Sequence, residues 1–598
     1  MVLTAAVGSS VIGGLQASPE RCQPDDLWKL TVPAFDDPTM IAAEIDFTMF
    51  AAPVSPTEGP RTHLQRLEWA QQLWDALEPL QRDVLCDHLR HASWVDHFSG
   101  IGCRTQMVIQ ICKVVADKTG VDFDSLSVRA FTDTEIDTNK RRFTNAFAPP
   151  FRAMHEMDDI TRRLGHAMKC KVDQALKKTR GSTMQARRLN NQLLVDEIVA
   201  MYNSPDAQTR RSLLCAPCCK HLTKPLCPVS PYQIDDDVEM DPRTLSIVTG
   251  GPVCHEVSAM GKMMGDAGLS HVATKMFVEE VGLTKPDICM VECTPRWPCA
   301  LLSSVLEPLG YNVQKVHLCG NDVGDVYNRP RLGAVATSPD MHFLKPLSSF
   351  LQQAGSYVSE ELTLGSFWCA SPEELEIGML DLRRLRGKPR PTTDEQFYDW
   401  DEILLESHAR RLVAYGQQRD LLISQGKMAR TDDFICDLDQ NPEAGRGRSC
   451  HPGSKGMMTF TRHGTLWHWH LRRPLLGVET MRVHCWPIET EHIDTVGAAC
   501  SVMDLVRNGT VHPRELHAFV GDSWHLRVQG LWLMWVLSNV INGRIGEVPR
   551  SLQLETPQKK KSRSVESPGG DSQSSVHPTT RTPPSRDSEL AICISDSD

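Results

Sequence analysis

The sequence of 598 residues predicts an α/β protein built on a mostly parallel sheet. From Trp94 onward, short apolar segments of strand length alternate with longer helical stretches, which is the pattern of a parallel sheet with helical crossovers. Two of these segments run directly into glycine turns, as strands do where the carboxyl edge of such a sheet approaches a ligand. The expected strands are 94–98, 128–132, 245–249, 288–291, 313–318 and 332–336.

Composition limits the classes of protein that fit. Hydrophobic residues make up 41% of the chain and charged residues 23%, as in ordinary globular proteins. The net charge of −11 argues against binding nucleic acid through overall charge alone. The 20 irregularly spaced cysteines, without a secretory signal, indicate reduced intracellular thiols. The longest apolar run, 531–541, is too short to cross a bilayer, so we expect a soluble protein with no membrane partner.

The N-terminal region, residues 1–90, is expected to be an extension with amphipathic helices. Its first 60 or so residues carry Pro, Gly and Ser without a period. Leu64, Leu67, Trp74 and Leu77 then recur at helical spacing, and the pattern resumes after Pro79.

A basic and cysteine-rich insertion is expected at 161–240. Between 161 and 190 a single acid, Asp173, opposes nine basic residues, which gives either a polyanion-binding surface or a solvated helical face. Farther along, a Cys-x-x-Cys pair with a nearby His and Cys could bind zinc, but the second half of a finger spacing is missing. Reduced thiols are the favoured reading, so no metal residue is assigned. The cluster is Cys215, Cys218, Cys219, His221 and Cys227.

The last segment, 549–598, is expected to be a disordered tail. Ser, Thr and Pro make up 20 of the 48 residues from Ser551 on, and no aromatic residue is present. Its basic cluster 559–563 resembles a nuclear import signal, which an import receptor would bind, and predicts a nuclear location. Its final residues, 592–598, resemble a motif that binds small ubiquitin-like modifiers by adding an edge strand.

Two constellations of residues carry chemistry. The first expected strand enters the turn Ser99 to Gly102, and Glu135 follows the next strand, where an acid can bind a ribose diol. Asp159 and Ile160 then offer one polar and one apolar contact to an adenine. In the second constellation, Cys254 stands on a stiff turn after the strand 245–249, as a nucleophile would.

In their order these motifs resemble the cytosine-5 DNA methyltransferase family over residues 94–541. The segment 96–102 matches Asp-x-Phe-Ser-Gly-x-Gly, and 250–254, with Ser258 and Gly261, aligns with the nucleophile motif. Glu292 falls in the Glu-Asn-Val stretch, and Arg329 and Arg331 fall in Gln-x-Arg-x-Arg. Later matches are Arg473, Leu475, Glu479, Arg482, Trp486-Pro487 and Gly521-Asp522-Ser523.

The resemblance implies a Rossmann-like methyltransferase fold that uses S-adenosylmethionine and methylates DNA through a covalent Cys254 intermediate. Glu292 would assist at ring nitrogen 3 of the base, Arg329 and Arg331 would lie on one strand and support the site, and the target base would be flipped out. The cofactor would bind at Asp96, Phe98, Ser99, Gly100, Gly102, Glu135, Asp159, Ile160, Asp522 and Ser523.

The same resemblance divides the chain and leaves alternatives open. The catalytic domain would span 91–337 and 471–548, with a smaller target-recognition region at 338–470, where Trp467 and Trp469 are interpreted as core residues. The family residues are replaced at Val253, His255, Cys293-Thr294, Tyr327 and Asp522. An RNA cytosine-5 methyltransferase and a catalytically weak binding paralogue therefore remain alternatives to a DNA enzyme.

Overall fold

The computed structural model divides the described chain into two compact units, each made of discontinuous segments. The larger unit contains 66–361, 484–512 and the segment from 522 on, and the smaller contains 362–483 and 513–521 with the first few described residues. The predicted tail, with its import and modifier motifs, lies outside the described residues. Those residues are 59–126, 129–147, 153–178, 183–224, 226–231, 243–252, 267–268, 270–325, 327–354, 364–393, 397–445, 447–454, 456–462 and 464–545.

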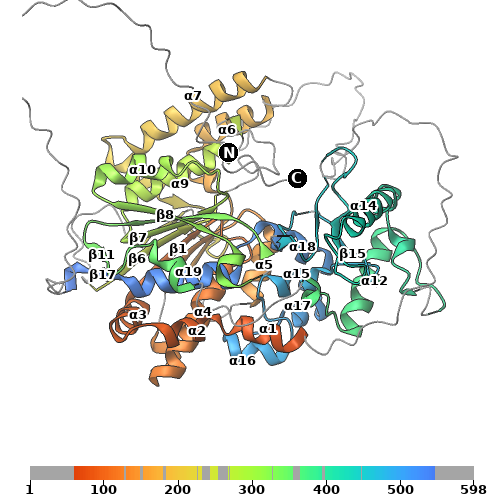
Figure 1. Cartoon of the computed structure of the whole chain (residues 1–598). Coiled ribbons are helices and arrows are strands. Elements are labelled where there is room, and N and C mark those ends of the chain that lie inside the picture. Colours follow the sequence, from red (N-terminus) through yellow and green to blue (C-terminus); the bar gives the residue numbers. More distant parts are fainter. Residues whose placement is uncertain are drawn as a thin grey trace, which may run out of the picture. The chain divides into compact units, whose positions relative to one another are not determined.

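The larger unit is built on a seven-stranded sheet of described residues with the order β3-β2-β1-β6-β7-β10-β8 (Figure 1). Neighbours from β3 to β7 run parallel, whereas β10 is antiparallel to both β7 and β8. The expected α/β class with a mostly parallel sheet is thus confirmed, with one reversed strand. The bounds are β1 (Ala92–His97), β2 (Arg129–Thr134), β3 (His155–Met157), β6 (Leu245–Gly250), β7 (Ile288–Cys293), β8 (Asn312–Leu318) and β10 (Arg331–Thr337).

Four of the interior strands are buried along their whole length because both of their faces are covered. Every residue of β1, β6, β7 and β10 is buried, as expected for strands packed between two layers of helices. Strand β8, at one edge, mixes exposed and buried residues. The covered strands are the ones whose carboxyl ends carry most of the predicted site.

Helices cover both faces of this sheet (Figure 1). On one face α19 (Leu526–Asn539) packs against α2 (Trp69–Ala76), α3 (Pro79–His91) and α4 (Cys103–Thr119), and all residues of α19 are buried. On the other face are α6 (His166–Lys178), α7 (Met184–Tyr202), α9 (Ser270–Thr284) and α10 (Ala300–Leu306).

Shorter elements of the larger unit connect these layers. They are α5 (Thr138–Phe147), α8 (Ala207–Leu213), α11 (Ser349–Ala354), α16 (Ile493–Val496), α17 (Val502–Arg507), β4 (Cys215–Ala216), β5 (Cys227–Pro228), β9 (Tyr327–Asn328), β11 (Met341–Phe343) and β17 (Val540–Asn542). Helices α1 (Gly59–Leu67) and α18 (Pro513–Asp522) cross from one unit's segments to the other's.

The smaller unit has a four-stranded sheet with the order β13-β12-β15-β16. Trp467 is buried, as predicted for a core residue, whereas Trp469 is half-buried and packs beside Phe434. The elements are α12 (Pro372–Leu385), α14 (Glu406–Ser424), α15 (Gly477–Val483), β12 (Ile435–Asp437), β13 (Ser449–Cys450), β14 (Met457–Met458), β15 (Leu466–His468) and β16 (Arg473–Pro474).

Buried ion pairs join the elements of the smaller unit. Glu479 accepts two hydrogen bonds from Arg473, each 2.7 Å long, and Arg482 pairs with Glu374 at 2.8 Å. Glu374 also belongs to the capping box of α12. Three charged residues of the matched 473–487 motif therefore hold this unit together.

None of the described helices combines the length and the hydropathy that crossing a bilayer would require.

Candidate active site

The turn between β1 and α4 is shaped by three residues with left-handed backbone. Phe98, Gly100 and Gly102 have φ angles of 55°, 62° and 73°. At Gly102 an added Cβ would lie 2.5 Å from Cγ2 of Thr144, so both the backbone angle and the space require glycine. At Gly100 an added Cβ would meet no atom within 4 Å. Gly100 thus offers open space in which a ligand can approach the backbone closely.

Glu135 braces this turn from the end of β2. Its carboxylate accepts hydrogen bonds from the backbone N–H of Gly100 at 2.8 Å and of Asp137 at 2.9 Å. The side chain is buried, and burial raises its pKa against the opposing charge of Lys140. The structure therefore brings Glu135 to the glycine turn, as predicted from the order of the strands.

Asp159 and Ile160 follow β3 at the same edge of the sheet, because the N–H of Glu135 bonds to the carbonyl of Met157 on β3. Asp159 caps a short 3₁₀ helix (Ile160–Arg163) and accepts hydrogen bonds from the N–H and hydroxyl of Thr161 at 2.9 and 2.7 Å. Ile160 is buried in the core of the larger unit. The carboxylate of Asp159 is thus engaged in local structure.

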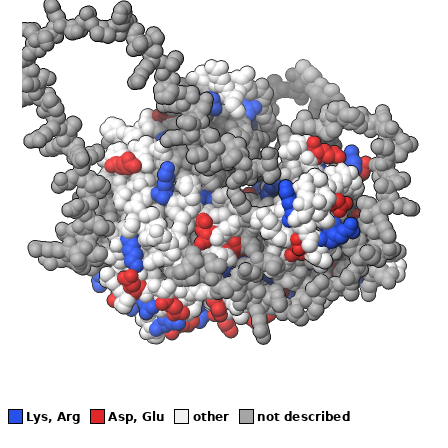
Figure 2. Space-filling model, in the orientation of Figure 1, with Lys and Arg blue, Asp and Glu red and all other residues white. Residues whose placement is uncertain are grey.

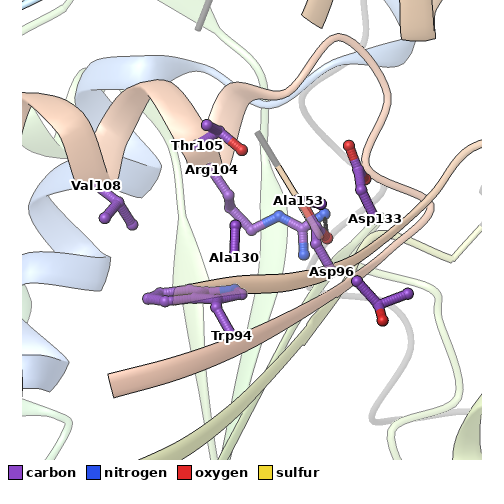
Figure 3. Close-up of a pocket in the computed structure, with 9 residues that line it drawn as sticks. Trp94, Asp96, Arg104, Thr105, Val108, Ala130, Asp133 and Ala153 are labelled. Carbon is purple, nitrogen blue, oxygen red and sulfur yellow. Dashed lines mark ion pairs between the residues drawn. The ribbon is translucent and has the colours of Figure 1, made fainter. Parts of the chain in front are cut away.

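A small pocket lies under the glycine turn, between α4 and the strands β1 and β2 (Figure 3). The guanidinium of Arg104 reaches into it and pairs with Asp96. Burial lowers the pKa of Arg104 to about 9 and raises the pKa of Asp133, also on the pocket wall, to about 6. Asp96 therefore anchors Arg104 at the foot of the turn.

Two residues of this site, Arg104 and Trp524, were not predicted from the sequence. The guanidinium carbon of Arg104 lies 4.8 Å from the centre of the Trp524 ring, at cation–π distance. Arg104 is an ordinary helix residue in the sequence, and Trp524 simply follows the predicted Asp522-Ser523 pair. Adjacency to that pair was the one available signal for Trp524.

The second half of the site is a buried ion pair between a glutamate near the end of β7 and an arginine at the start of β10. Glu292 is buried and its Oε1 lies 2.8 Å from Nε of Arg331. Burial raises the pKa of Glu292, while Arg331 and Arg329 oppose that rise. Burial therefore shifts this carboxyl group toward its protonated form relative to an exposed glutamic acid, and the neighbouring arginines oppose that shift.

The Gly250-Gly251-Pro252 turn lies beside Glu292, because Gly250 is the register partner of Val291 on β7. The N–H of Gly251 bonds to the carbonyl of His97 at 3.2 Å, and an added Cβ there would lie 2.9 Å from Nε1 of Trp524. Beyond the turn, the predicted nucleophile Cys254 and its neighbours Val253 and His255 lie outside the described residues.

Two of the replaced family positions keep contacts in this region. Cys293 stands where the family has Asn, and its thiol lies 3.4 Å from the carbonyl of Pro252. Tyr327 stands where the family has Gln, and its hydroxyl lies 3.4 Å from a nitrogen of Arg329. Both residues therefore contact other segments of the candidate site.

Arg329 lies in the connection between β9 and β10, so the expectation that it shares a strand with Arg331 is wrong. The connection turns its guanidinium toward the carbonyl of Ser523, to which it donates at 2.9 Å. Ser523 is buried, and Asp522 pairs with Lys140 on α5 at 3.1 Å. Arg329 thus ties the last predicted motif to the strand that carries Arg331.

Several basic residues of the segment 161–190 are paired with acidic neighbours. Arg162 pairs with Asp158 at 2.8 Å, Lys169 pairs with Asp173 at 2.6 Å, and Arg163 is buried against Glu280. On the face drawn in Figure 2, basic and acidic side chains of the described residues are interspersed. These pairs support the solvated or structural reading for part of the segment.

Comparisons with known proteins give structural likenesses at low identity. No family model and no curated protein matches the sequence. The chain is similar to the Dnmt2 methyltransferase of S. pombe, with 12% identity, 75% of this chain and 98% of that chain covered, and a TM-score of 0.34. It is also similar to the methyltransferase EhMeth of Entamoeba histolytica, with 10% identity, the same coverages and a TM-score of 0.35.

Proposed function

We propose that this protein is an S-adenosylmethionine-dependent cytosine-5 methyltransferase that acts on DNA. The observation that carries the proposal is the convergence at one sheet edge of motif residues far apart in the sequence. Three features lie at the ends or starts of neighbouring strands: the glycine turn braced by Glu135, the Gly-Gly-Pro turn before Cys254, and the buried pair of Glu292 and Arg331. Ligands of open α/β sheets bind at such an edge.

The residues at the first turn fit the cofactor. Open space at Gly100 allows close backbone approach, and the buried carboxylate of Glu135 has lone pairs left for the hydroxyls of a ribose. Asp159 and Ile160 would border the adenine, and Phe98, Ser99, Gly102, Asp522 and Ser523 would complete the cradle. S-adenosylmethionine supplies an electrophilic methyl group when it is bound.

The chemistry follows from the poor nucleophilicity of cytosine carbon 5. The thiolate of Cys254 would form a bond to carbon 6, and the π electrons of the C5–C6 bond would move to carbon 5, which then takes the methyl group and leaves S-adenosylhomocysteine. Transfer of the carbon 5 proton to a water molecule acting as base would then break the bond from carbon 6 to sulfur, which releases the thiolate and restores the ring. Glu292, with its raised pKa, would donate a hydrogen bond or proton to nitrogen 3 as charge develops there.

Covalent trapping tests this proposal. The full-length protein is incubated with S-adenosylmethionine and matched DNA and RNA oligonucleotides that contain 5-fluorocytosine, whose fluorine blocks the final elimination. We expect a denaturant-resistant adduct with DNA that Cys254→Ser abolishes and Cys86→Ser, a control on α3, retains.

Two outcomes would contradict the proposal. An adduct with RNA alone would reassign the substrate class. No adduct with either nucleic acid, from protein that still binds S-adenosylmethionine, would favour a binding paralogue without turnover.

A further inference from the structure

Four potential metal ligands from distant parts of the chain meet at the edge of the large sheet. His155 lies on the edge strand β3, whereas Cys218, His221 and Cys227 belong to the segment around the β4–β5 hairpin. One ligand atom of each residue lies within 4.8 Å of the ligand atoms of the other three. This gathering is outside the proposed active site and has no role in its chemistry.

The distances around His221 fit a tetrahedral zinc site. Its Nδ1 lies 3.2 Å from Nδ1 of His155, 3.4 Å from Sγ of Cys218 and 3.5 Å from Sγ of Cys227. With Zn–N near 2.05 Å and Zn–S near 2.3 Å, tetrahedral geometry requires about 3.3 Å between two nitrogens and about 3.6 Å between nitrogen and sulfur. All three distances agree with these values to within about 0.2 Å.

Hydrogen bonding alone does not account for this arrangement. A neutral imidazole nitrogen either carries one proton or accepts, so Nδ1 of His221 cannot satisfy three neighbours at once. Cys218 and Cys227 are free thiols in the structure, so the cluster is not closed by a disulfide. A metal at its centre would engage all four atoms together.

The ligand set selects the metal and its role. Two thiolates and two imidazoles suit zinc, whereas magnesium and calcium prefer oxygen ligands. Four protein ligands leave no open position for substrate, which is the mark of a structural site. The surroundings are consistent with this role, because Cys218 and Cys227 pack with Met157, Ala216 and Val229 in a small apolar cluster.

We propose that His155, Cys218, His221 and Cys227 bind a structural zinc ion that fastens the cysteine-rich segment to β3. The two strands of the hairpin are two residues long, and so short a hairpin is not stable by itself. The N–H of Cys219 bonds to the carbonyl of Glu156 on β3 at 2.8 Å, which aligns the segment along the otherwise open edge. The zinc would also steady β3 next to Asp159.

The sequence could not identify this set because its fourth member is remote. The cluster at 215–227 lacks the second pair of a finger spacing, and we assigned no metal residue there. His155 supplies the missing ligand from a strand 60 or so residues upstream, where nothing in the spacing points to it.

Metal analysis of the full-length protein, purified without chelator, tests the proposal independently of methyl transfer. We expect close to one zinc ion per chain by mass spectrometry. Cys218→Ser and His155→Ala should lose it, whereas the neighbouring Cys219→Ser, which lies outside the set, should retain it. Cobalt substituted for zinc should give the visible bands of a tetrahedral site with sulfur ligands.

A second variant separates loss of metal from loss of fold. His221→Cys creates a set of three Cys and one His, which is also a structural zinc set, so this variant should keep the metal and strengthen the thiolate-to-cobalt band. Wild-type protein without zinc, zinc retained in Cys218→Ser, zinc lost from a folded His221→Cys, or a Cys218–Cys227 disulfide in the purified protein would each overturn the proposal.

Discussion

At the scale of single residues, Glu292 is a buried carboxyl group whose pKa is raised by burial, although Arg331 beside it opposes the rise. Since its pKa is raised by burial, the protonated fraction is larger than for an ordinary Glu and falls as pH rises through the folded-state pKa. We expect Glu292→Gln to slow adduct formation by about 10²–10⁴-fold, the usual contribution of a general acid. The ratio of wild-type to variant rate should also fall with rising pH, because only the wild type loses a proton donor.

Single-turnover trapping across a pH series measures this ratio, in which the ionisation of the thiol common to both proteins cancels. A ratio that is constant with pH, or a variant that also fails to bind S-adenosylmethionine, would contradict the assigned role of Glu292.

Asp133 gives a pH dependence of stability with a defined sign. Burial raises its pKa from 3.8 to about 6, so the folded state binds this proton more tightly than the unfolded state. The resulting stability is fully present below the unfolded pKa and is lost as pH rises through about 6. Asp133→Asn should therefore stabilise the protein by about 1–3 kcal/mol at about pH 8 and much less near pH 4.

Thermal unfolding of wild type and variant at both pH values checks this sign. The exposed Asp124→Asn, in the short 3₁₀ helix Phe123–Ser125 before β2, is the matched control and should shift neither curve. A larger gain at the lower pH would contradict the prediction.

At the scale of elements, two glycines of the turn between β1 and α4 allow an effect on ligand binding to be distinguished from an effect on folding. Gly100→Ala meets no neighbour and pays only for its left-handed backbone, about 1–2 kcal/mol, but its methyl group would occupy the space left for the cofactor. Gly102→Ala adds a clash with Thr144 to the same backbone cost. We expect Gly100→Ala to fold and bind S-adenosylmethionine at least about tenfold more weakly, which corresponds to about 1.4 kcal/mol.

Gly102→Ala should instead lower the melting temperature more than Gly100→Ala does. Calorimetric titration with S-adenosylmethionine and thermal unfolding of both variants distinguish the two effects. Equal losses of binding and of stability in the two variants would show that the turn has no open side.

The elements that the sequence predicted well are those whose burial is continuous. Strands β1, β6, β7 and β10 were expected within one or two residues because runs covered on both faces must be apolar. Strand β3, His-Glu-Met, carries no apolar run and takes its strand conformation from pairing with β2. The reversal of β10 likewise depends on its two neighbours, which local patterns do not encode.

The residues of the candidate site divide in the same way, into those that local sequence indicates and those that depend on distant partners. The glycine turns and Glu135 follow strand ends and could be placed from strand order, whereas Glu292, near the end of β7, was predicted from the family resemblance. Arg104 and His155 could not, because what marks each of them is a partner distant in sequence: Trp524 for Arg104, and Cys218 and Cys227 for His155. The position of Arg329 off its expected strand has the same origin, since the carbonyl of Ser523 that it meets lies 194 residues away.

At the scale of the whole molecule, the larger unit is closed by the chain segment that follows α19. Strand β17 pairs with β11, and Arg544 pairs with Asp287 at 2.8 Å. Asp287 also accepts the N–H of Ser246 at 2.7 Å, so the last described residues tie to the starts of β6 and β7. Among the described residues, the segment 540–545 therefore forms the C-terminal closure of the larger unit.

This closure predicts where the chain can be shortened. Ending the chain after Val548 keeps β17 and Arg544, and removes a segment whose composition cannot form a core, so the melting temperature should stay within about 2 °C of the full-length value. Ending it after Asn539 removes both anchors, leaves Asp287 without its arginine, and should lower the melting temperature by several degrees or prevent folding. Thermal unfolding of the two truncations compares them, with Arg544→Ala in the full chain as an intermediate case.

If the removed tail carries the import signal, the chain that ends after Val548 should also lose nuclear accumulation when it is expressed as a fluorescent fusion, while it still forms the adduct in vitro. Equal stability of the two truncations would show that β17 and Arg544 do not close the fold.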